Sequence, residues 1–249
     1  IADQEAGLVR NYNIWNNEKF LLDGPISASV YAMDVRGTDL WVAPGGRDGS
    51  FGNIYNPGAF YSYTDGKWNS YTRLNAPFLD SIRDVLSVAV DPRNPKHVFL
   101  GSWGYRLFEY LNGQLVKIYD ASNSSLQFSM KQPDRLIIGG MSYDTDNNLW
   151  IVNSFAPDLL SVLKNNNTWK SFNLGTTVDA GSIAIDKTGQ KWILQRDHTM
   201  LVFNDNNTID NAADDRTKRL TGNAGNGGLP GQYVQCLAVD QEGEVWIGT

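Results

Sequence analysis

One short phrase of sequence occurs five times along this chain, and this repetition limits the folds open to it. The last copy spans residues 237–248, and degraded copies lie near residues 31–42, 88–100, 141–151 and 183–193. Each copy contains an aspartate that we call its anchor. The anchors are Asp34, Asp91, Asp144, Asp186 and Asp240. Internal repetition on this scale is typical of propellers and repeat arrays.

Each copy predicts a β-hairpin. The residue two before each anchor is small and its neighbours are bulky, which predicts a strand with one closely packed face. A turn residue with a left-handed backbone is expected three residues after each anchor, where the aspartate can bond back to the turn amides. These residues are Gly37, Asn94, Asn147, Gly189 and Gly243. A second apolar strand follows, with an aromatic residue in every copy. The aromatic residues are Trp41, Phe99, Trp150, Trp192 and Trp246.

The spacing of the anchors predicts the larger unit. Consecutive anchors lie 42 to 57 residues apart, which is room for four short strands and their loops. Further strands are expected at 59–68, 106–118, 160–172 and 200–203, separated by turn residues such as Asp65 and Gly66. We therefore predict an all-β fold, a β-propeller of four-stranded antiparallel blades. Its five blade signatures lie near residues 30–43, 86–101, 139–152, 182–194 and 235–249.

The two ends of the chain do not coincide with blade ends. Residues 1–22 resemble third and fourth strands, whereas the chain stops after a second strand. The first strands could complete the C-terminal blade and close a ring, which would remove exposed strand edges. Alternatively, they are the outer strands of an adjoining blade. We favour the second interpretation, in which residues 1–249 are one propeller region of a larger, seven-bladed, multi-propeller protein.

Composition excludes several classes of function. The chain has 21 basic and 27 acidic residues, and its basic residues are scattered, so binding to nucleic acid is not expected. No segment is long and apolar enough to predict a transmembrane helix. The lone Cys236 lies in a first-strand pattern and is expected to be a small buried residue, with no disulfide in the chain.

Propeller topology predicts where a binding site would lie. The loop after the second strand of a blade and the loop into the next blade emerge on one face, which we call the mouth. The candidate ligand-binding residues on these loops are Arg47, Trp103, Tyr105, Arg106, Asn153, Phe155, Arg196 and His198. Aromatic rings beside arginines suit a sugar or an anionic glycolipid. In the alternative interpretation, Trp103 and Phe155 cap the blade core. The insert 45–58 is the longest mouth loop and is expected to be functional or disordered.

The sequence offers no catalytic or metal-binding constellation. His97 is expected to be a solvated turn residue, and neither it nor His198 belongs to a nucleophile or metal motif. The segment 144–148 has alternating oxygens but is the hairpin turn of its copy. Whether the acidic loop from Asp205 to Asp215 binds calcium stays open. We expect no cofactor and no enzyme activity. A propeller glycosidase or lyase would need two carboxylates facing one cleft, and Asp197 is the only evident carboxylate of the mouth loops besides Asp48.

Several segments in order resemble the PorZ-like β-propeller proteins of the type IX secretion system. They are residues 41–46, 86–92, 102–104, 107–110, 149–154 and 202–215. The C-terminal phrase alone also resembles the repeat of two-component-regulator propellers. The first resemblance covers nearly the whole chain and would correspond to the second propeller of such a protein. The β-sandwich that follows it in that family has no counterpart in this sequence.

The resemblance implies a non-enzymatic adaptor in protein secretion. Such a protein works at the cell surface, associated with the outer membrane, beside a sortase-like protease that attaches cargo to anionic lipopolysaccharide. Lipopolysaccharide binding and protein partners of the attachment complex are therefore expected. The alternative is the extracytoplasmic, ligand-sensing propeller of a hybrid two-component histidine kinase, located in the periplasm.

Overall fold

The computed structural model describes residues 2–3, 7–13, 15–20, 23–176, 178–229 and 234–249. Antiparallel strands dominate these residues, and the one short helical segment among them is a 3-10 turn, η1 (Pro77–Ser81). Four blades of four strands each, A to D, are followed by a two-stranded blade E, and hydrogen bonds join blades B and C into one eight-stranded sheet. Blade A comprises β4 (Ala32–Arg36), β5 (Asp39–Ala43), β6 (Ala59–Thr64) and β7 (Lys67–Thr72). Blade B comprises β8 (Val85–Val90), β9 (His97–Gly104), β10 (Leu107–Leu111) and β11 (Gln114–Tyr119).

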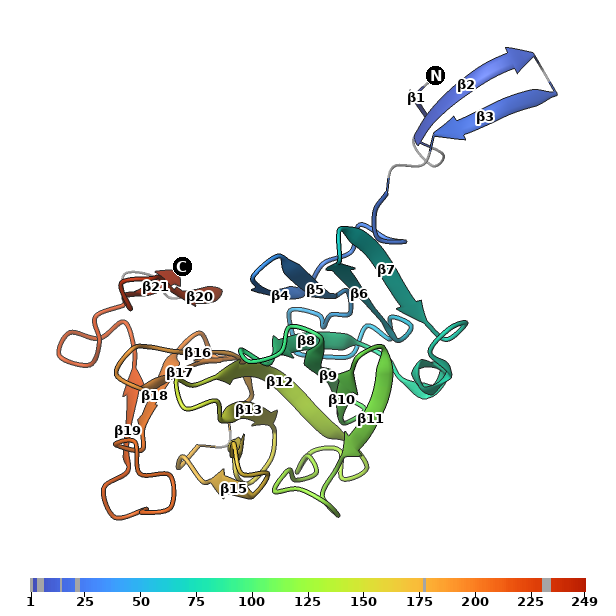
Figure 1. Cartoon of the computed structure of the whole chain (residues 1–249). Helices are drawn as coiled ribbons and strands as arrows, with labels where there is room; N and C mark the ends of the chain where they lie inside the picture. The colour runs from blue at the N-terminus through green and yellow to red at the C-terminus, as the bar shows by residue number, and fades with distance from the viewer. Residues whose placement is uncertain (1, 4–6, 14, 21–22, 177, 230–233) are drawn as a thin grey trace.

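The remaining blades repeat this order. Blade C comprises β12 (Leu136–Tyr143), β13 (Leu149–Ser154), β14 (Leu160–Leu163) and β15 (Trp169–Phe172). Blade D comprises β16 (Ala180–Ile185), β17 (Lys191–Gln195), β18 (Met200–Asn204) and β19 (Arg216–Leu220). Blade E comprises β20 (Cys236–Val239) and β21 (Val245–Gly248). The first strands β4, β8, β12, β16 and β20 contact one another in that order, so the blades follow each other around an axis, as Figure 1 shows. The predicted all-β propeller is therefore confirmed.

The anchor aspartates explain why the hairpins form. The Oδ1 atom of Asp144 accepts the turn N–H groups of Asp146 and Asn148, at 3.0 and 2.8 Å. Its Oδ2 atom accepts the indole N–H of Trp150 at 2.8 Å. The same indole bond joins Trp192 to Asp186 at 2.8 Å and Trp246 to Asp240 at 2.6 Å. Across the hairpin, the ring of each tryptophan lies opposite the small residue that precedes the anchor by two. The pairs are Ser142 with Trp150, Ala184 with Trp192, and Ala238 with Trp246.

Blade A uses its anchor differently because its tryptophan comes one residue later. Asp34 lies directly opposite Trp41 in the hairpin. The carboxylate of Asp34 accepts the backbone N–H of Val90 at 2.8 Å, and Trp41 donates to the carbonyl of Pro95 at 2.9 Å. Both partners belong to blade B, so this copy of the repeat joins two blades.

Three expectations at the level of single residues are wrong. Asn94 is not left-handed, because Pro95 restricts it and the wider hairpin closes by two successive turns, from Asp91 to Asn94 and from Asn94 to His97. His97 is not a solvated turn residue. It begins β9, and its ring nitrogens lie 2.9 Å from Asp91 and 2.9 Å from Glu109.

Cys236 is also misassigned, because it is exposed at the start of β20 rather than buried. Blade E contains two strands, so less of the sheet covers its first strand than in blades A to D.

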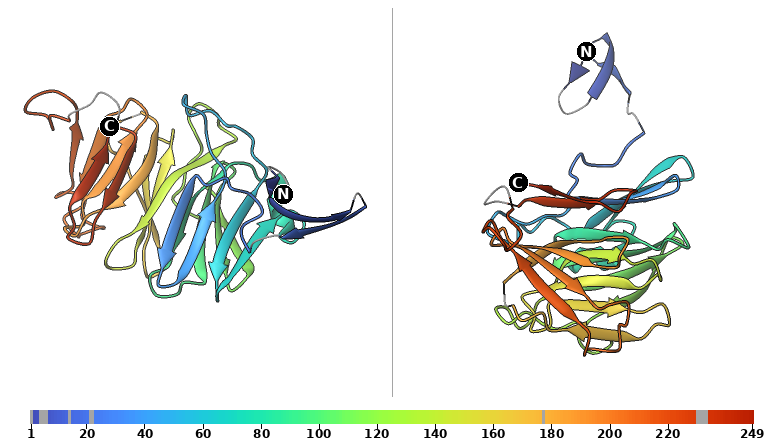
Figure 2. Two further views of the ribbon diagram at one scale, coloured as in Figure 1. Left: turned by 90° about the horizontal axis from the view of Figure 1, so that it is seen from above. Right: turned by 90° about the vertical axis from the view of Figure 1, so that its left-hand side faces the viewer.

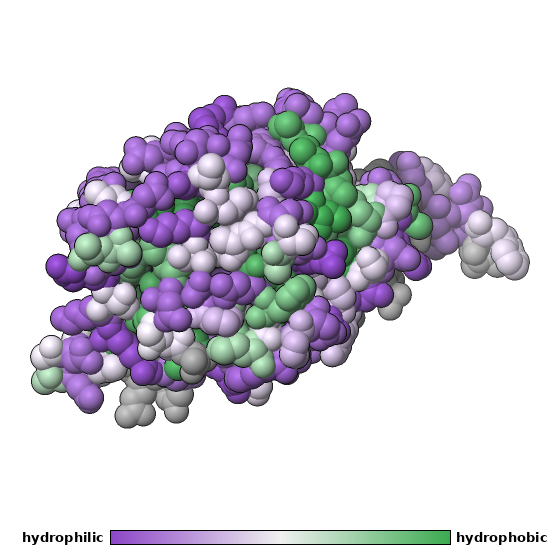
Figure 3. Space-filling view, turned by 90° about the horizontal axis from the view of Figure 1, so that it is seen from below, coloured by the Kyte–Doolittle hydropathy of each residue, from purple (hydrophilic) through white to green (hydrophobic). Residues whose placement is uncertain are grey.

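The hydrophobic core lies between consecutive blades. One cluster of Trp41, Phe60 and Tyr110 fills the space between blades A and B, and one of Trp150, Phe172 and Phe203 that between blades C and D. Other clusters lie between B and C and between D and E. Because apolar side chains are buried between the blades, the side of the molecule in Figure 3 is mostly hydrophilic, with one marked strip and several smaller groups of hydrophobic residues.

The N-terminal strands form a separate sheet. This sheet consists of β1 (Ala2–Asp3), β2 (Gly7–Asn13) and β3 (Asn16–Phe20), and it stands away from the blades in Figures 1 and 2. Among the described strands, none of β1 to β3 pairs with β20 or β21, so the sheet does not complete blade E in this structure. The part of the chain that the structure describes contains no helix suited to crossing a membrane.

Candidate functional site at the mouth

A pocket of about 400 Å³ opens on the mouth, a size typical of sites for small ligands. Its wall comes from blade A's loop 44–58, from the ends of β9 and β13, and from segment 129–132 that leads into blade C. We call it the mouth pocket. Its lining residues include Phe51, Asn53, Tyr55, Trp103, Ser129, Lys131, Gln132, Phe155 and Arg196.

Loop 44–58 is held in place at both ends. The N–H of Gly45 donates to the carbonyl of Val85 at 2.8 Å, and that of Gly58 to Ile82 at 3.0 Å. Between these points Arg47 and Asn53 form a β-bridge. The insert singled out by its length is therefore an ordered wall of the pocket.

A buried carboxylate fixes the second half of this loop. Asp84 is fully buried, with an exposed fraction of 0%. It accepts the side-chain amide of Asn53 at 3.1 Å and the backbone N–H groups of Tyr55 and Asn56 at 3.0 and 2.9 Å. Three such donors satisfy a buried carboxylate without a cation. Asp84 therefore determines where Asn53 and Tyr55 lie in the pocket wall.

Arg47 reaches from blade A to the other side of the mouth. Its guanidinium lies over the ring of Phe51 at 3.4 Å and over that of Trp103 at 4.7 Å. Gly181 in β16 gives it room, because a Cβ atom there would collide with the guanidinium. Burial lowers the pKa of Arg47, against the opposing effects of Tyr31 and Asp179. One buried nitrogen, Nη1, has no hydrogen-bond acceptor among the described residues.

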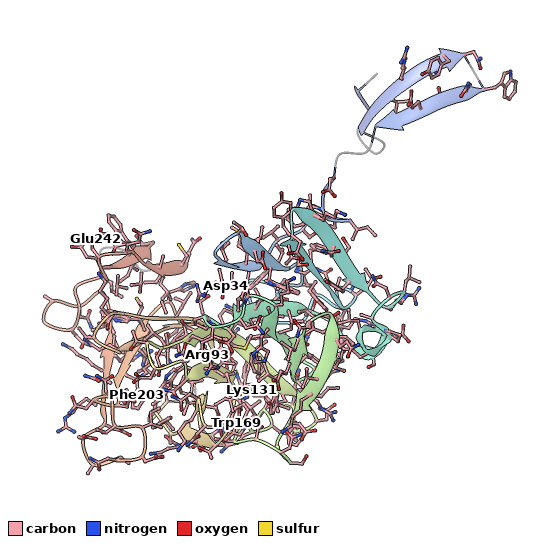
Figure 4. The ribbon with its side chains drawn as sticks, viewed as in Figure 1. Asp34, Arg93, Lys131, Trp169, Phe203 and Glu242 are labelled. Atoms are coloured by element: carbon pink, nitrogen blue, oxygen red, sulfur yellow. The ribbon has the colours of Figure 1, made fainter. Side chains whose placement is uncertain are left out.

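Two further cations converge on a second buried carboxylate. Asp179 has an exposed fraction of 3% and lies just before β16. Its oxygens lie 3.2 Å from Arg196 Nη1 and 3.5 Å from Lys131 Nζ. The ammonium of Lys131, labelled in Figure 4, also lies 4.4 Å from the centre of the Phe155 ring. The carboxylate thus orients two positive side chains that line the mouth pocket.

Some of the predicted site residues are buried in the protein beneath the pocket surface. Trp103 is almost fully buried, donates its indole N–H to the carbonyl of Phe51 at 3.0 Å, and packs with Phe155. Asn153 is fully buried, and its side chain accepts the N–H of Gln127 at 2.6 Å. These side chains are packed into the mouth, as the core-capping interpretation of Trp103 and Phe155 expected.

Three other predicted residues lie outside the mouth pocket. Tyr105 and Arg106 line a separate pocket beside it, and Arg106 approaches Asp120 at 3.6 Å. His198 is in the turn after β17, with Nδ1 3.3 Å from the carbonyl of Val234. The structure therefore brings Trp103, Phe155 and Arg196 to the mouth pocket, with Arg47 behind its wall.

Sequence reasoning missed several pocket residues. Phe51, Asn53 and Tyr55 lie in the long insert, for which length was the only signal. Lys131 and Gln132 lie in the segment between β11 and β12, which has no regular pattern. Asp179 could have been found, because it stands seven residues before its anchor, as Asp84 does.

Backbone strain distinguishes the two faces of the propeller. In the turns that join first to second and third to fourth strands, every non-glycine residue with positive φ in the described chain is Asn or Asp, which tolerate it. On the mouth face, the residues with positive φ are Phe51, Tyr55, Asp84, Arg106, Phe155 and His198. A left-handed backbone is costly for bulky side chains and occurs preferentially at functional sites.

Several other acidic residues form bonds within the protein. Asp48 accepts N–H groups of its own loop from Ser50 and Gly52, and Asp197 pairs with Arg219. In the loop from Asp205 to Asp215, Asp205 bonds Lys191 at 2.5 Å and Asp210 bonds Lys164 at 3.0 Å. The described residues contain no group of three or more His, Cys, Asp or Glu placed to hold a metal ion.

The fold and the repeated hairpin define the chain as a β-propeller, and residues 228–249 match the family described as two component regulator propeller. No curated protein matches the chain in sequence. Among solved structures it is similar to PorZ, described as an essential bacterial surface component of the type-IX secretion system of Porphyromonas gingivalis. The TM-score is 0.79 at 23% identity, covering 94% of this chain and 33% of PorZ.

Two other propellers are also similar. The extracellular domain of a putative hybrid two-component system from B. thetaiotaomicron has a TM-score of 0.59 at 15% identity, covering 100% of this chain and 32% of that one. Virginiamycin B lyase from Staphylococcus aureus has a TM-score of 0.61 at 11% identity, covering 94% of this chain and 68% of the lyase. These similarities establish the fold. The chain spans about a third of the length of the PorZ chain and of the extracellular domain of the two-component system.

Proposed function

We propose that this chain is a non-enzymatic binding module whose mouth pocket takes an acidic glycan. The observation that carries the proposal is the charge of the pocket. Lys131 and Arg196 line it, whereas no acidic residue does among the described residues. The chain as a whole has a net charge of −6, so this positive site is a local feature. Arginine and lysine held in place by a buried carboxylate are suited to bind carboxylate or phosphate groups.

The neutral groups of the pocket fit a sugar. The Tyr55 side chain has an exposed fraction of 61%, so its ring and hydroxyl are accessible to a ligand. Gln132 is also exposed and provides both a donor and an acceptor for hydroxyl groups. A flat aromatic ring beside polar and cationic side chains is typical of sites that bind polar ring ligands.

We further propose that the module serves as an adaptor in type IX secretion, at the cell surface and associated with the outer membrane. The support is the fold similarity to PorZ together with the ordered resemblance in sequence. In this role the acidic glycan is anionic lipopolysaccharide, and the partners are proteins of the attachment complex, including a sortase-like protease.

A second candidate is the ligand-sensing propeller of a hybrid two-component system. The match of residues 228–249 and the fold of the B. thetaiotaomicron extracellular domain favour it. A lyase activity has less support. Asp84 and Asp179 at the mouth are buried and bonded, and Asp48 and Asp197 are held by their own neighbours, so no pair of free carboxylates faces the pocket in the described chain.

Binding of purified anionic lipopolysaccharide and of a neutral glycan tests the proposal. Lys131→Ala and Arg196→Ala should each weaken lipopolysaccharide binding about tenfold or more, and binding should weaken with added salt. Lys218→Ala, an equal charge change on the outer strand β19, should leave it unchanged. Equal losses in all three variants would place the site elsewhere. Absence of binding would favour the sensor.

A further inference from the structure

A second pocket lies next to the mouth pocket. Its volume is about 520 Å³, and its lining includes Phe78, Tyr105, Arg106, Phe128 and Arg135. We call it the side pocket. The consecutive residues Trp103, Gly104 and Tyr105 separate the two pockets, since Trp103 lines the first and the other two line the second.

Gly104 lies between the two pockets and has no side chain to separate them. It has a φ of +112°, which side chains rarely adopt. A Cβ atom there would lie 3.4 Å from the Cδ atom of Arg135 and 3.8 Å from the amide nitrogen of Asn53. Arg135 belongs to the side pocket and Asn53 to the mouth pocket. A side chain at position 104 would therefore lie at the point where the two pockets meet.

Tyr55 is an exposed aromatic residue of the mouth pocket, and it belongs to the same loop as Asn53, which approaches Gly104. Asp84 holds its backbone N–H at 3.0 Å. In the side pocket, bonding to Tyr105 and the charge of Asp134 raise the pKa of Arg135 against the effect of burial.

An arginine stacks on an aromatic ring beside each pocket. Behind the wall of the mouth, Arg47 stacks on Phe51 and Trp103, and in the side pocket the guanidinium of Arg135 lies 4.6 Å from the centre of the Tyr105 ring. The Nη1 atom of Arg135 is buried and has no acceptor among the described residues. Because Arg135 lines the side pocket and a buried donor without an acceptor is costly, an anionic ligand in that pocket would supply the acceptor.

Resting on the proposed function of the mouth, we propose that the two pockets form one groove for an acidic oligosaccharide. Successive acidic sugar units occupy the mouth pocket and the side pocket, and Tyr55 supports the unit at their junction. Each pocket has two lining cations with a carboxylate beside them, Lys131 and Arg196 with Asp179 in the mouth, and Arg106 and Arg135 with Asp134 in the side pocket. Occupation of the side pocket by a second sugar unit therefore adds the dependence on chain length.

Oligogalacturonides of one to six units test this groove, because each ring carries one carboxylate. Affinity measured by calorimetry on the whole chain should rise about tenfold or more from the shortest bound oligomer to the hexamer. Fully methyl-esterified oligomers should bind weakly at every length. Arg135→Ala should abolish the rise, and so should Arg135→Lys, which keeps the charge but loses the planar fork. Arg216→Ala on β19 is the matched control and should keep it.

The outcomes separate this proposal from the proposed function. Affinity independent of length, with Lys131→Ala still weakening binding, would overturn the joined groove and leave the mouth site. Binding of lipopolysaccharide without binding of any oligogalacturonide would also overturn the groove. If neither bound, the mouth proposal would fail as well. Thermal unfolding of each variant establishes that a lost rise in affinity does not reflect a lost fold.

Discussion

Asp84 and Asp179 occupy the same position in two blades and hold different parts of the mouth. Each stands seven residues before its anchor. The carbonyl of each accepts the N–H of a residue at the end of the second strand, Trp103 at 2.9 Å and Arg196 at 2.8 Å. Their carboxylates differ in partners, because that of Asp84 takes the amides of a loop and that of Asp179 takes two cations.

Exchanging each carboxylate for an amide should separate these roles. Asp84→Asn replaces an acceptor with a donor that faces N–H groups, so we expect the free energy of unfolding to fall by about 1–3 kcal/mol. At Asp179 the partners are the flexible side chains of Lys131 and Arg196, which can move to solvent. We therefore expect Asp179→Asn to lower the free energy of unfolding by less than about 1 kcal/mol. Denaturant unfolding of both variants measures the difference. Equal losses would mean that Asp179 is also needed for folding.

Gly181 should control the position of Arg47. In Gly181→Ala the new methyl group would displace the guanidinium, which is the mobile end of a long side chain, so stability should change by less than about 1 kcal/mol. Binding of the acidic ligand should nevertheless weaken, and the fluorescence of Trp103 should change as the stacked cation leaves. The control is Gly49→Ala, because Gly49 lies in the loop that carries Arg47 and has open space around it. Unchanged binding in Gly181→Ala would argue against a role for Arg47.

His97 should make stability depend on pH. A neutral imidazole has one N–H, whereas both ring nitrogens of His97 lie 2.9 Å from carboxylates, so the arrangement favours the charged ring. Although burial opposes it, bonding to Glu109 and Asp91 raises the pKa of His97. The pKa of Glu109 is lowered, chiefly by its bond to His97. Other charged or titratable groups beside this cluster are Arg93, Lys117, Tyr119 and Tyr143.

The pKa shifts of His97 and Glu109 determine how stability changes with pH. A raised histidine pKa stabilises the fold below its unfolded value near 6.5, and this stabilisation is lost as the pH rises through the folded pKa. The contribution of Glu109 is lost at the opposite end, as the pH falls through its lowered pKa. The wild-type chain should therefore be more stable at pH 6 than at pH 9, and His97→Gln should reduce this difference. A difference of the same size in the variant would exclude His97 as its source.

The hydrogen bond from the tryptophan indole to its anchor should contribute differently to the free energy of unfolding in different blades. Trp150 is fully buried, whereas Trp246 has an exposed fraction of 63%, and both donate to their anchors. Trp150→Phe removes one of the two donors to the Oδ2 atom of Asp144 and leaves a void in the core, so it should cost about 1–3 kcal/mol. Trp246→Phe should cost about 0.5 kcal/mol or less. Denaturant titration of the two variants compares them directly.

The repeat allowed the hairpins to be predicted, because its chemistry is local. In three copies the aspartate, the turn residue and the tryptophan lie within six residues of one another, and the aspartate bonds both of the others. The prediction failed at Asn94, where Pro95 changes the turn. It also missed β19, whose residues Arg216, Lys218 and Arg219 give no apolar alternation. Charged residues are common on edge strands, where they oppose pairing with other chains.

The candidate site was only partly predictable, for a different reason. Topology indicated which loops meet at the mouth, and Arg196 lies there. Sequence does not reveal which way an aromatic ring points, so it left open whether Trp103 contacts ligand or caps the blade core. In the structure Trp103 is buried and also forms part of the pocket lining. Conversely, Tyr55 and Lys131 lie in irregular segments, and contacts made across blades by Asp84 and Asp179 place them at the pocket.

The left-handed bulky residues of the mouth make this face a place where thermostability and ligand recognition compete. Replacing Phe51 or Phe155 with glycine would relieve the backbone, but it would also remove a ring that shapes the pocket. Selection for heat resistance alone would therefore tend to erode binding at the mouth. The Asn- and Asp-rich turns on the opposite face carry no such conflict, so they are the better sites for attaching labels or inserting sequence.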